Sequence, residues 1–400
     1  PPVGRMIGFD EACARIAALP ERAAVERIPL DQAAGRILAA DIVASLDAPR
    51  ADVSAMDGYA VREADLARLP ARLRLAGESF PGQPDLPEVG ERACVRIFTG
   101  APVPPGADRG GIQEQVTRDG GVVRFERPLG PARHIRPRGG DFRAGEILLA
   151  AGTRLDARSI VAAAAADLSE IEVHCRPRVI VLATGDELAE PGTARASPVA
   201  IPESVSFGVA AMAAQWSGAP AGRYRLPDDS GVLEHAARAA LDAADLIVVT
   251  GGASVGEKDH AKAMFGPAGL ECIFTKVAIK PGKPAWLGRA RGKLVLGLPG
   301  NPTSALVAAR LFLAPLLLRM GGGDPSSALR WRESVLAEGL PAVRDRETFV
   351  RACWAGNRVM PLSDQDSGAQ RALAAAELLV RRGIGAPARA AGETVDVLDF

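Results

Sequence analysis

Three continuous apolar runs occur in the second half of the chain, at residues 179–183, 246–250 and 294–298. Runs without polar alternation are typical of parallel strands that are buried on both faces of a sheet. Residues 206–216 and 231–243, which lie between these runs, have helical patterns. The alternation of strand and helix therefore predicts an α/β domain with a mostly parallel sheet over residues 176–323.

The rest of the chain has shorter apolar runs. Residues 49–140 are rich in Gly and Pro and predict an inserted β domain, and residues 324–400 follow a Gly-rich linker and predict a C-terminal β domain. Helical patterns occur near residues 9–17 and 154–166. A long apolar helix is expected after residue 300, with Asn301 as its N-cap and Pro302 in its first position. The fold class is thus multidomain α/β plus β.

Charge and composition exclude several classes of protein. The 400 residues include 48 Lys+Arg and 48 Asp+Glu, so no global positive field is available to hold nucleic acid or an acidic membrane. The five cysteines form no CxxC pair, which favours idle thiols in a reducing compartment. No secretory leader is visible at the start, and the apolar stretch 305–318 falls short of the roughly 20 residues that cross a bilayer. We therefore expect a cytoplasmic protein.

Each predicted parallel strand ends in a tight polar turn. These turns are Thr184-Gly185-Asp186-Glu187, Thr250-Gly251-Gly252 and Pro299-Gly300-Asn301-Pro302. Ligands of open parallel sheets bind beyond the carboxyl ends of the strands, where glycine lets backbone N–H groups approach an anion. One such turn would be an ordinary connection, but three together favour a ligand site.

The lysines are confined to one part of the chain. All six lie between residues 258 and 293, and every other basic residue apart from histidine is arginine. Lysine binds an oxyanion as a compact point charge, whereas arginine needs forked geometry. We assign an oxyanion-binding role to Lys276, Lys280 and Lys283, which flank a Pro-Gly turn. A solvated basic surface is the expectation for Lys258, Lys262 and Lys293.

Carboxylates near the same turns suit a divalent cation. Asp186 and Glu187 lie at the first turn, Asp228-Asp229 lies between the first two strands, and Glu257 and Asp259 follow the second turn. Mg²⁺ takes one or two carboxylates together with substrate oxygens. Each acid taken singly is better explained as a helix cap or a surface charge, and Asp57 could be a turn aspartate.

Two familiar motifs are excluded. Residues 252–256 spell GxSxG after a strand, but a serine hydrolase needs a catalytic histidine well downstream of the serine. The only histidine after Ser254 is His260, six residues later. Neither GxxxxGK[ST] nor GxGxxG occurs, so a P-loop and a dinucleotide fold are unsupported. The four histidines have no metal-ligand spacing, and a structural role is expected for each.

Seven ordered motifs resemble the MoeA family of molybdopterin molybdenumtransferases. They are SAMDGYAV (54–61), RIFTGAPVPPGAD (96–108), IRPRGGD (135–141), VLATGDEL (181–188), TGGASVGEKDH (250–260), KVAIKPGKP (276–284) and GLPGNPTSALV (297–307). The resemblance covers about residues 8–400 and extends to the E domain of gephyrin. It implies a linker domain built from residues 1–48 and 141–175, with the α/β domain similar to MoaB.

The resemblance also implies a reaction and its participants. The expected substrates are molybdate and adenylylated molybdopterin, with Mg²⁺ as cofactor and release of AMP. The expected assembly is a homodimer, and molybdopterin adenylyltransferase and recipient molybdoenzymes are further candidate partners. The resemblance assigns catalysis to Asp57, Asp141, Glu187, Asp228 and Asp259, with Glu187 and Asp259 at the metal. We expect substrate contacts from Thr99, Arg136, Thr184, Gly185, Gly251, Gly252, Ser254, Lys276, Lys280, Lys283, Pro299, Gly300, Asn301 and Pro302.

Three departures from the family pattern leave alternatives open. Glu203-Ser204-Val205 replaces an Asp-Ser-Asn triplet, Ala376-Glu377-Leu378 replaces Ala-Asn-Gly, and Arg109-Gly110-Gly111 is expected to break a strand of the inserted domain. A lost asparagine removes one donor and one acceptor from a pocket. The alternatives are a diverged paralogue that is a non-catalytic cofactor-binding scaffold, a protein that handles tungstate, and a molybdopterin adenylyltransferase. The inserted and C-terminal β domains argue against the last.

Overall fold

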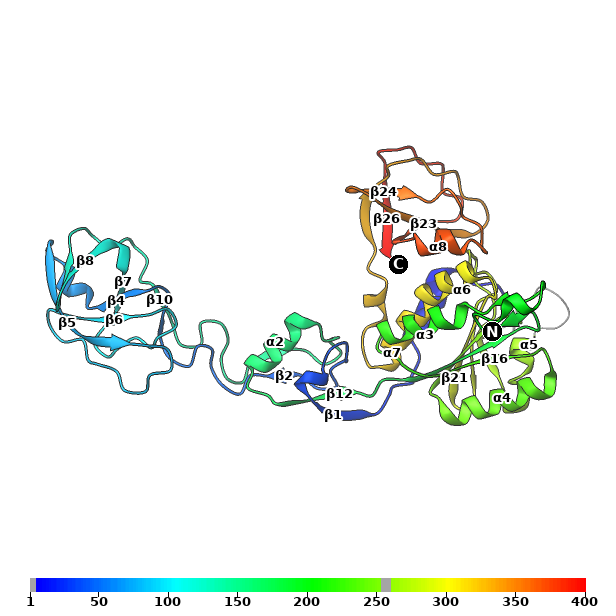
Figure 1. Ribbon diagram of the computed structural model, residues 1–400, viewed down its shortest axis with the longest axis horizontal. Helices are drawn as coiled ribbons and strands as arrows, with labels where there is room; N and C mark the ends of the chain where they lie inside the picture. The colour runs from blue at the N-terminus through cyan, green and yellow to red at the C-terminus, as the bar shows by residue number, and fades with distance from the viewer. Residues whose placement is uncertain (1–4, 253–259) are drawn as a thin grey trace.

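The computed structural model describes residues 5–252 and 260–400 and shows an elongated molecule. A β domain lies at one end, a small linker domain in the middle, and an α/β domain with a second β domain at the other end (Figure 1). The chain runs out to the far β domain and returns, so residues distant in sequence meet in the linker domain. The predicted multidomain α/β plus β fold is confirmed.

The inserted β domain is a six-stranded sheet in the order β7-β4-β6-β5-β9-β8. Its strands are β4 (Gly58–Val61), β5 (Ala71–Ser79), β6 (Ala93–Ile97), β7 (Arg109–Ile112), β8 (Val116–Asp119) and β9 (Val122–Phe125). The expected break at residues 109–111 was wrong, because this segment forms β7 and pairs with β4. Arg109 Nη1 donates to Glu63 and Nη2 donates to the carbonyl oxygen of Gly130. A Cβ at position 111 would lie 2.8 Å from Cε1 of Phe125, so the glycine fits a close contact inside the sheet domain.

The linker domain is made from two chain segments. Strands β1 (Val25–Pro29) and β2 (Ile42–Val43) come from the first segment. They pair with β12 (Glu170–His174) and β11 (Ile147–Leu149) from the second, beside helix α2 (Ala157–Ala165). Helix α1 (Phe9–Ala17) does not belong to this unit: Phe9 and Ile16 are in the core of the α/β domain.

The α/β domain has a six-stranded sheet in the order β16-β13-β17-β21-β20-β18. The first four are parallel: β16 (Ala219–Leu226), β13 (Arg178–Thr184), β17 (Leu246–Thr250) and β21 (Lys293–Leu298). β20 (Trp286–Ala290) pairs antiparallel with β21, and β18 (Glu271–Phe274) pairs antiparallel with β20. All three apolar runs are therefore strands, as predicted.

Successive residues of β13 point into different cores, as the pleat requires. Val179 and Val181 pack with helix α3 (Val205–Gln215), whereas Ile180 and Leu182 pack with helix α4 (Ser230–Ala243). The sheet thus has a helical layer on each face. This arrangement fixes the strand ends at a single edge, where the three turns lie.

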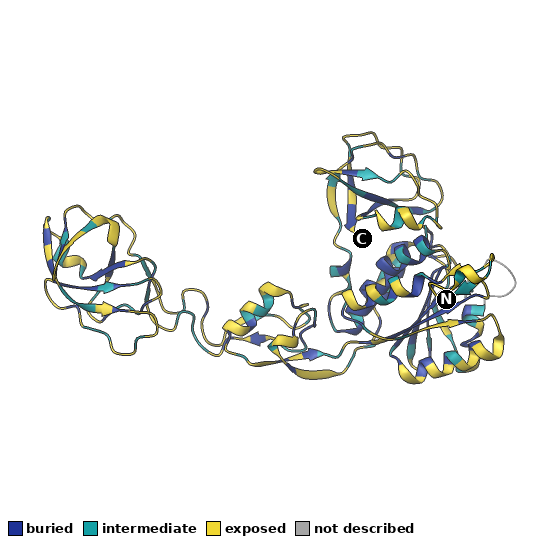
Figure 2. Cartoon of the chain, in the orientation of Figure 1, coloured by how far each residue is buried: buried dark blue, intermediate teal, exposed yellow. Residues whose placement is uncertain are grey.

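A long apolar helix covers one face of the sheet. It runs through α6 (Pro302–Ala308), a π-helical turn η6 (Ala309–Leu313) and α7 (Ala314–Met320). It is long and apolar enough to cross a membrane, but 89% of its most apolar window is buried inside the protein (Figure 2). Asn301 occupies the N-cap position with Pro302 next, as expected, but its side chain does not cap the helix. Instead, Asn301 Nδ2 donates to Ser367 Oγ at 2.9 Å.

The C-terminal β domain shares a strand with the α/β part of the chain. Its sheet has the order β19-β23-β25-β26-β22, and β24 (Arg358–Pro361) pairs with β23. The strands are β19 (Ile279–Lys280), β22 (Arg332–Val335), β23 (Glu347–Ala355), β25 (Leu378–Arg382) and β26 (Thr394–Asp399). Because β19 precedes β20 in the chain, the predicted lysine segment is the joint between the two domains.

Candidate functional site

A pocket of about 700 Å³ opens at the carboxyl ends of the parallel strands. It is lined by Thr184 and Gly185 after β13, Thr250 to Gly252 after β17, and Pro299 to Pro302 after β21. The three turns that the sequence singled out therefore meet in one hollow. Gly368 and Gln370 of the C-terminal domain form part of its wall.

Glycine allows these turns to approach one another. Gly251 has φ +87°, and a Cβ there would lie 2.3 Å from the carbonyl oxygen of Thr184. A Cβ on Gly300 would in turn lie 3.3 Å from Cα of Gly251. A left-handed φ and such distances suit glycine, because other residues would be strained or would clash. The turns are therefore packed backbone to backbone around the pocket.

The Thr184 hydroxyl is a polar group without a partner. The residue is 2% exposed, lines the pocket, and its Oγ1 makes no hydrogen bond among the described residues. A buried hydroxyl without a partner costs free energy, and such groups are uncommon in folded proteins. At the wall of the pocket, the Thr184 hydroxyl is available to donate a hydrogen bond to a ligand.

Three carboxylates line the pocket, and its described lining contains no Lys or Arg. They are Glu187, Glu203 and Asp228. The neighbouring acids have structural roles: Asp186 accepts a hydrogen bond from the backbone N–H of Asp228 at 3.0 Å. Asp229 caps α4 by accepting from the N–H of Val232 at 2.9 Å. Glu187 and Asp228 are thus the pocket acids whose side chains make no hydrogen bond or ion pair among the described residues.

Glu203 is held differently. It is buried, and its carboxylate accepts from the backbone N–H of Ser206 at 2.8 Å and from Ser206 Oγ at 2.5 Å. Arg223 donates to the same Ser206 hydroxyl at 2.9 Å. The carboxylate therefore satisfies the first turn of α3. Val205, the next departure from the family triplet, presents an apolar side chain to the pocket.

The pocket fits a magnesium ion only in part. Among the residues that the structure describes, no group of three or more His, Cys, Asp or Glu side chains is placed to hold a metal. Mg²⁺ commonly keeps several waters and takes one or two protein carboxylates together with substrate phosphates. Glu187 and Asp228 meet that smaller requirement. Asp259, which was assigned to the metal, and Ser254 lie outside the described residues.

A second group of expected residues lies in the inserted domain. Asp57 Oδ1 accepts from the backbone N–H of Thr99 at 2.7 Å and from Thr99 Oγ1 at 2.8 Å. These two bonds lower the pKa of Asp57, so the carboxylate is ionised and fixed in place. Arg136 is in β10 (Ile135–Arg136), which pairs with β3 (Val53–Ser54) close to Asp57 in sequence. Asp141 is exposed, and its backbone N–H donates to the carbonyl oxygen of Ala48.

These residues do not reach the pocket within one chain. The inserted domain and the α/β domain occupy opposite ends of the molecule, with the linker domain between them (Figure 1). The structure therefore places Asp57, Thr99 and Arg136 in the inserted domain, Asp141 where that domain joins the linker domain, and Glu187 and Asp228 in the α/β domain.

The three lysines assigned to oxyanions also lie outside the described pocket lining. Lys276, Lys280 and Lys283 are all exposed, and only Pro284, next to Lys283, lines the pocket. The backbone between the first two is not extended, because the N–H of Ile279 bonds to the carbonyl oxygen of Val277. Lys280 instead lines a different hollow against the C-terminal domain.

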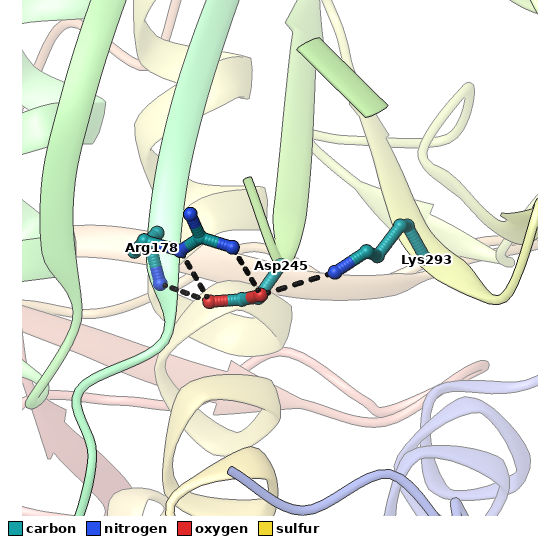
Figure 3. A network of polar contacts seen from close by, with 3 residues as sticks. All are labelled: Arg178, Asp245 and Lys293. Atoms are coloured by element: carbon teal, nitrogen blue, oxygen red, sulfur yellow. Dashed lines mark hydrogen bonds and ion pairs between the residues drawn. The ribbon is translucent and has the colours of Figure 1, made fainter. Parts of the chain in front are cut away.

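The other three lysines, for which a solvated basic surface was expected, also lie outside the described pocket lining. Lys293 Nζ donates to Asp245 at 3.2 Å, beside three hydrogen bonds from Arg178 to the same carboxylate (Figure 3). This network lies at the amino ends of β13 and β21, away from the pocket. Lys262 lies 5.4 Å from the ring centre of Trp286, and Lys258 is outside the described residues.

Several pocket residues carried no functional signal in the sequence. Ile201, Pro202, Gly368 and Gln370 are small or apolar, or come from a distant segment. His260 also lines the pocket, although histidines were expected to be structural. Its place at the end of the TGGASVGEKDH motif was the available signal.

Comparison with known proteins gives consistent matches along the chain. Residues 7–166 match the model described as MoeA N-terminal region (domain I and II). Residues 180–319 match the "Probable molybdopterin binding domain", and residues 333–400 match the MoeA C-terminal region (domain IV). The three matches follow the order of the domains in the structure.

Curated relatives align with about four fifths of this chain. A molybdopterin molybdenumtransferase of Haemophilus influenzae is 38% identical over 79% of this chain and 78% of its own length. The molybdopterin molybdenumtransferase 2 of Mycobacterium tuberculosis is 39% identical over 81% of this chain and 82% of its own. The crystal structure of the molybdopterin biosynthesis MoeA protein from Pyrococcus horikoshii superposes with a TM-score of 0.85 at 25% identity, covering 99% of this chain and 100% of that one.

Proposed function

The chain belongs to the MoeA family of molybdopterin molybdenumtransferases, and on that premise we propose that it inserts molybdate into adenylylated molybdopterin with release of AMP. The observation that carries this proposal is the convergence of three glycine turns around one pocket with an unpartnered Thr184 hydroxyl. Closely packed turns offer backbone N–H groups to phosphate oxygens, and the hydroxyl supplies a further donor. The pocket therefore suits a large polar anionic substrate.

Carboxylates in the same pocket would complete the site. Glu187 and Asp228 would hold Mg²⁺ together with oxygens of the substrate, and the ion would neutralise the charge of the phosphoanhydride. The two side chains also favour a cation electrostatically, because no Lys or Arg occurs in the described lining. Their role in the fold is small, since neither side chain makes a hydrogen bond within the part of the chain that the structure describes.

The separation of the two acid groups supports a homodimer. Asp57, held ionised by Thr99, cannot reach the pocket of its own chain, because the linker domain lies between them. A second chain in antiparallel orientation would bring its inserted domain to that pocket. Light scattering at micromolar concentration should then give twice the 41.6 kDa mass of one chain, and a monomer mass would contradict the assembly.

The direct test of function is reconstitution. Purified protein is incubated with adenylylated molybdopterin, molybdate and Mg²⁺, and AMP and active cofactor are measured. We expect Glu187→Gln to lower the rate at least tenfold while the melting temperature stays nearly unchanged. Glu190→Gln is the matched control, because Glu190 is exposed on the same segment but does not line the pocket.

One observation favours a second candidate, a cofactor-binding scaffold without catalysis. Val205 presents an apolar side chain to the pocket where the family triplet has an amide. A scaffold would bind molybdopterin but release no AMP in the same assay. Replacing molybdate by tungstate separates the two metals, and the assay can also be run with molybdopterin adenylyltransferase or a recipient molybdoenzyme added.

A further inference from the structure

The C-terminal β domain contributes a polar side chain to the wall of the pocket. This residue is Gln370, the first residue of the short helix α8 (Gln370–Ala374), which packs beside α6 (Figure 1). Gly368, the other residue of this domain in the described lining, has no side chain. Within that lining, Gln370 is therefore the side chain through which the C-terminal domain can contact a ligand.

The carboxamide of Gln370 has no partner in the protein. The described lining of the pocket contains two carboxamides, those of Asn301 and Gln370. Asn301 Nδ2 is engaged, because it donates to Ser367 Oγ at 2.9 Å. The Gln370 side chain is exposed and makes no hydrogen bond with any residue that the structure describes. A carboxamide supplies both donors and an acceptor, and all of them remain available at Gln370.

Hydrogen bonds fix the segment that carries Gln370. The backbone N–H of Thr303, in the first turn of α6, donates to the carbonyl oxygen of Ser367 at 3.1 Å. Gln365 bonds to the backbone of Arg351 in β23: its Oε1 accepts from the N–H at 3.0 Å, and its Nε2 donates to the carbonyl oxygen at 2.8 Å. The segment is thus tied to both domains. A residue on a fixed segment binds a ligand with a smaller loss of conformational entropy than a residue on a mobile loop.

The other polar groups of the pocket suit the charged parts of a ligand. The glycine turns and the Thr184 hydroxyl suit phosphate oxygens, and Glu187 and Asp228 suit a cation. Val205, the first residue of α3, is apolar where the family triplet ends in asparagine. None of these groups matches the edge of a heterocyclic ring, which presents a donor and an acceptor side by side. The carboxamide of Gln370 does.

We propose that Gln370 binds the edge of a nitrogen heterocycle that carries an amino group next to a ring nitrogen. Glutamine pairs in this bidentate way with N6 and N7 of adenine in nucleic acids. The carboxamide oxygen accepts from the amino group, and the carboxamide NH₂ donates to the ring nitrogen. Adenine and the pterin both present such an edge, so adenylylated molybdopterin has two rings of this chemistry. The inference rests on the proposed function, because it names the part of the same substrate that reaches the C-terminal domain.

Gln370 is a substrate-contacting residue in this assignment and takes no part in the chemistry. Its two bonds form when the ring binds and persist in the transition state. Their removal should therefore raise KM and leave kcat nearly unchanged. Gln370→Leu removes the carboxamide and keeps the backbone N–H, so it tests the side chain alone. The residue is exposed, so the melting temperature should not change.

The test is calorimetric titration of the full chain with AMP and with 6-hydroxymethylpterin. We expect Gln370→Leu to weaken binding of the ring that Gln370 contacts by about tenfold. Loss of affinity for AMP assigns adenine to this position, and loss of affinity for the pterin assigns the pterin. IMP is the chemical control for adenine, because a carbonyl oxygen replaces the amino group and its affinity should not depend on Gln370.

Gln215→Leu is the matched control variant. Gln215 is the exposed last residue of α3, at the opposite end of that helix from the pocket, and it does not line the pocket. The same chemical change there should leave the affinity for both rings equal to that of the wild type.

A further arm measures proximity without using activity. Gln370→Cys is alkylated with iodoacetamide in the presence and absence of AMP or 6-hydroxymethylpterin, with the wild-type cysteines as background. The bound ring should slow the reaction of Gln370→Cys and leave that of Gln215→Cys unchanged. Failure of both rings to bind the wild type, equal affinity of wild type and Gln370→Leu for both, or alkylation that neither ring slows would overturn the proposal. Transfer activity is measured separately, so its absence with Gln370-dependent ring binding retained contradicts the proposed function and not the contact.

Discussion

Replacing Thr184 by valine should make the protein more stable and its pocket less able to bind substrate. Thr184 ends β13, is 2% exposed, and has a hydroxyl without a hydrogen-bond partner in residues 5–252 and 260–400. Valine has nearly the same shape and suits a strand, so no cavity is created. The substitution removes the polar group and leaves the packing.

The magnitude follows from the environment of the hydroxyl. A buried polar group without a partner costs about 1–3 kcal/mol, and part of that cost remains if the pocket admits water. We therefore expect Thr184→Val to raise the free energy of unfolding by about 1 kcal/mol. The loss of one hydrogen bond to a charged phosphate costs about 1.5–3 kcal/mol, so the dissociation constant for substrate should rise by roughly tenfold or more.

Thr303→Val is the matched control. Thr303 is also fully buried, but its Oγ1 accepts from Arg351 Nη1 at 3.1 Å. The same substitution there should lower the free energy of unfolding by about 1–3 kcal/mol, because it leaves a buried guanidinium with one bond fewer. Urea denaturation gives both stabilities, and titration with adenylylated molybdopterin gives the affinities. If Thr184→Val destabilises the chain as much as Thr303→Val, or binds substrate as the wild type does, the hydroxyl is not held in readiness for a ligand.

Three further variants test other parts of the structure. Burial alone would raise the pKa of Asp245, but hydrogen bonds from Arg178 lower it to about 2. The carboxylate therefore stabilises the fold above about pH 4, and this stabilisation is lost as the pH falls toward 2. Because the Asp245 side chain is 33% exposed, Asp245→Asn should lower the free energy of unfolding by only about 1–2 kcal/mol at pH 7 and by almost nothing near pH 2. Asp242→Asn, in an exposed ion pair, is the control and should have little effect at either pH. Urea titrations measure both variants. Gly111→Val should destabilise the inserted domain by about 1–3 kcal/mol in thermal unfolding, since its side chain meets Phe125. Asp57→Asn should abolish AMP release while leaving the melting temperature nearly unchanged, and an active variant would contradict its catalytic role.

The sequence predicted those features that depend on local patterns. Continuous apolar runs identified β13, β17 and β21, because a strand buried on both faces needs apolar residues at every position. The glycine turns that follow them identified the pocket edge, because parallel strands end on the same side of a sheet. Both inferences needed only spacing and residue type.

Features that depend on tertiary contacts were not visible in the same way. The segment at residues 109–111 has poor strand propensity, yet it forms β7 because Arg109 is paired with Glu63 and the glycines fit beside Phe125. Nothing local could show that Asn301 would bond to Ser367, 66 residues later, and not to its own helix. In both cases, tertiary packing and long-range side-chain bonds within the chain overrode the local preference.

The lysine segment shows that an expectation about chemistry does not by itself fix the geometry. The restriction of lysine to residues 258–293 is a compositional signal, and it indicated oxyanion chemistry without showing which side chains converge. In the structure, Lys280 faces arginines of the C-terminal domain, while Pro284 lines the acidic pocket. The turn between them is tight: a Cβ on Gly282, at φ +113°, would lie 2.8 Å from Cδ1 of Ile279. Only three residues, 281–283, therefore lie between Lys280, in a hollow lined by cations, and Pro284, in a pocket lined by carboxylates.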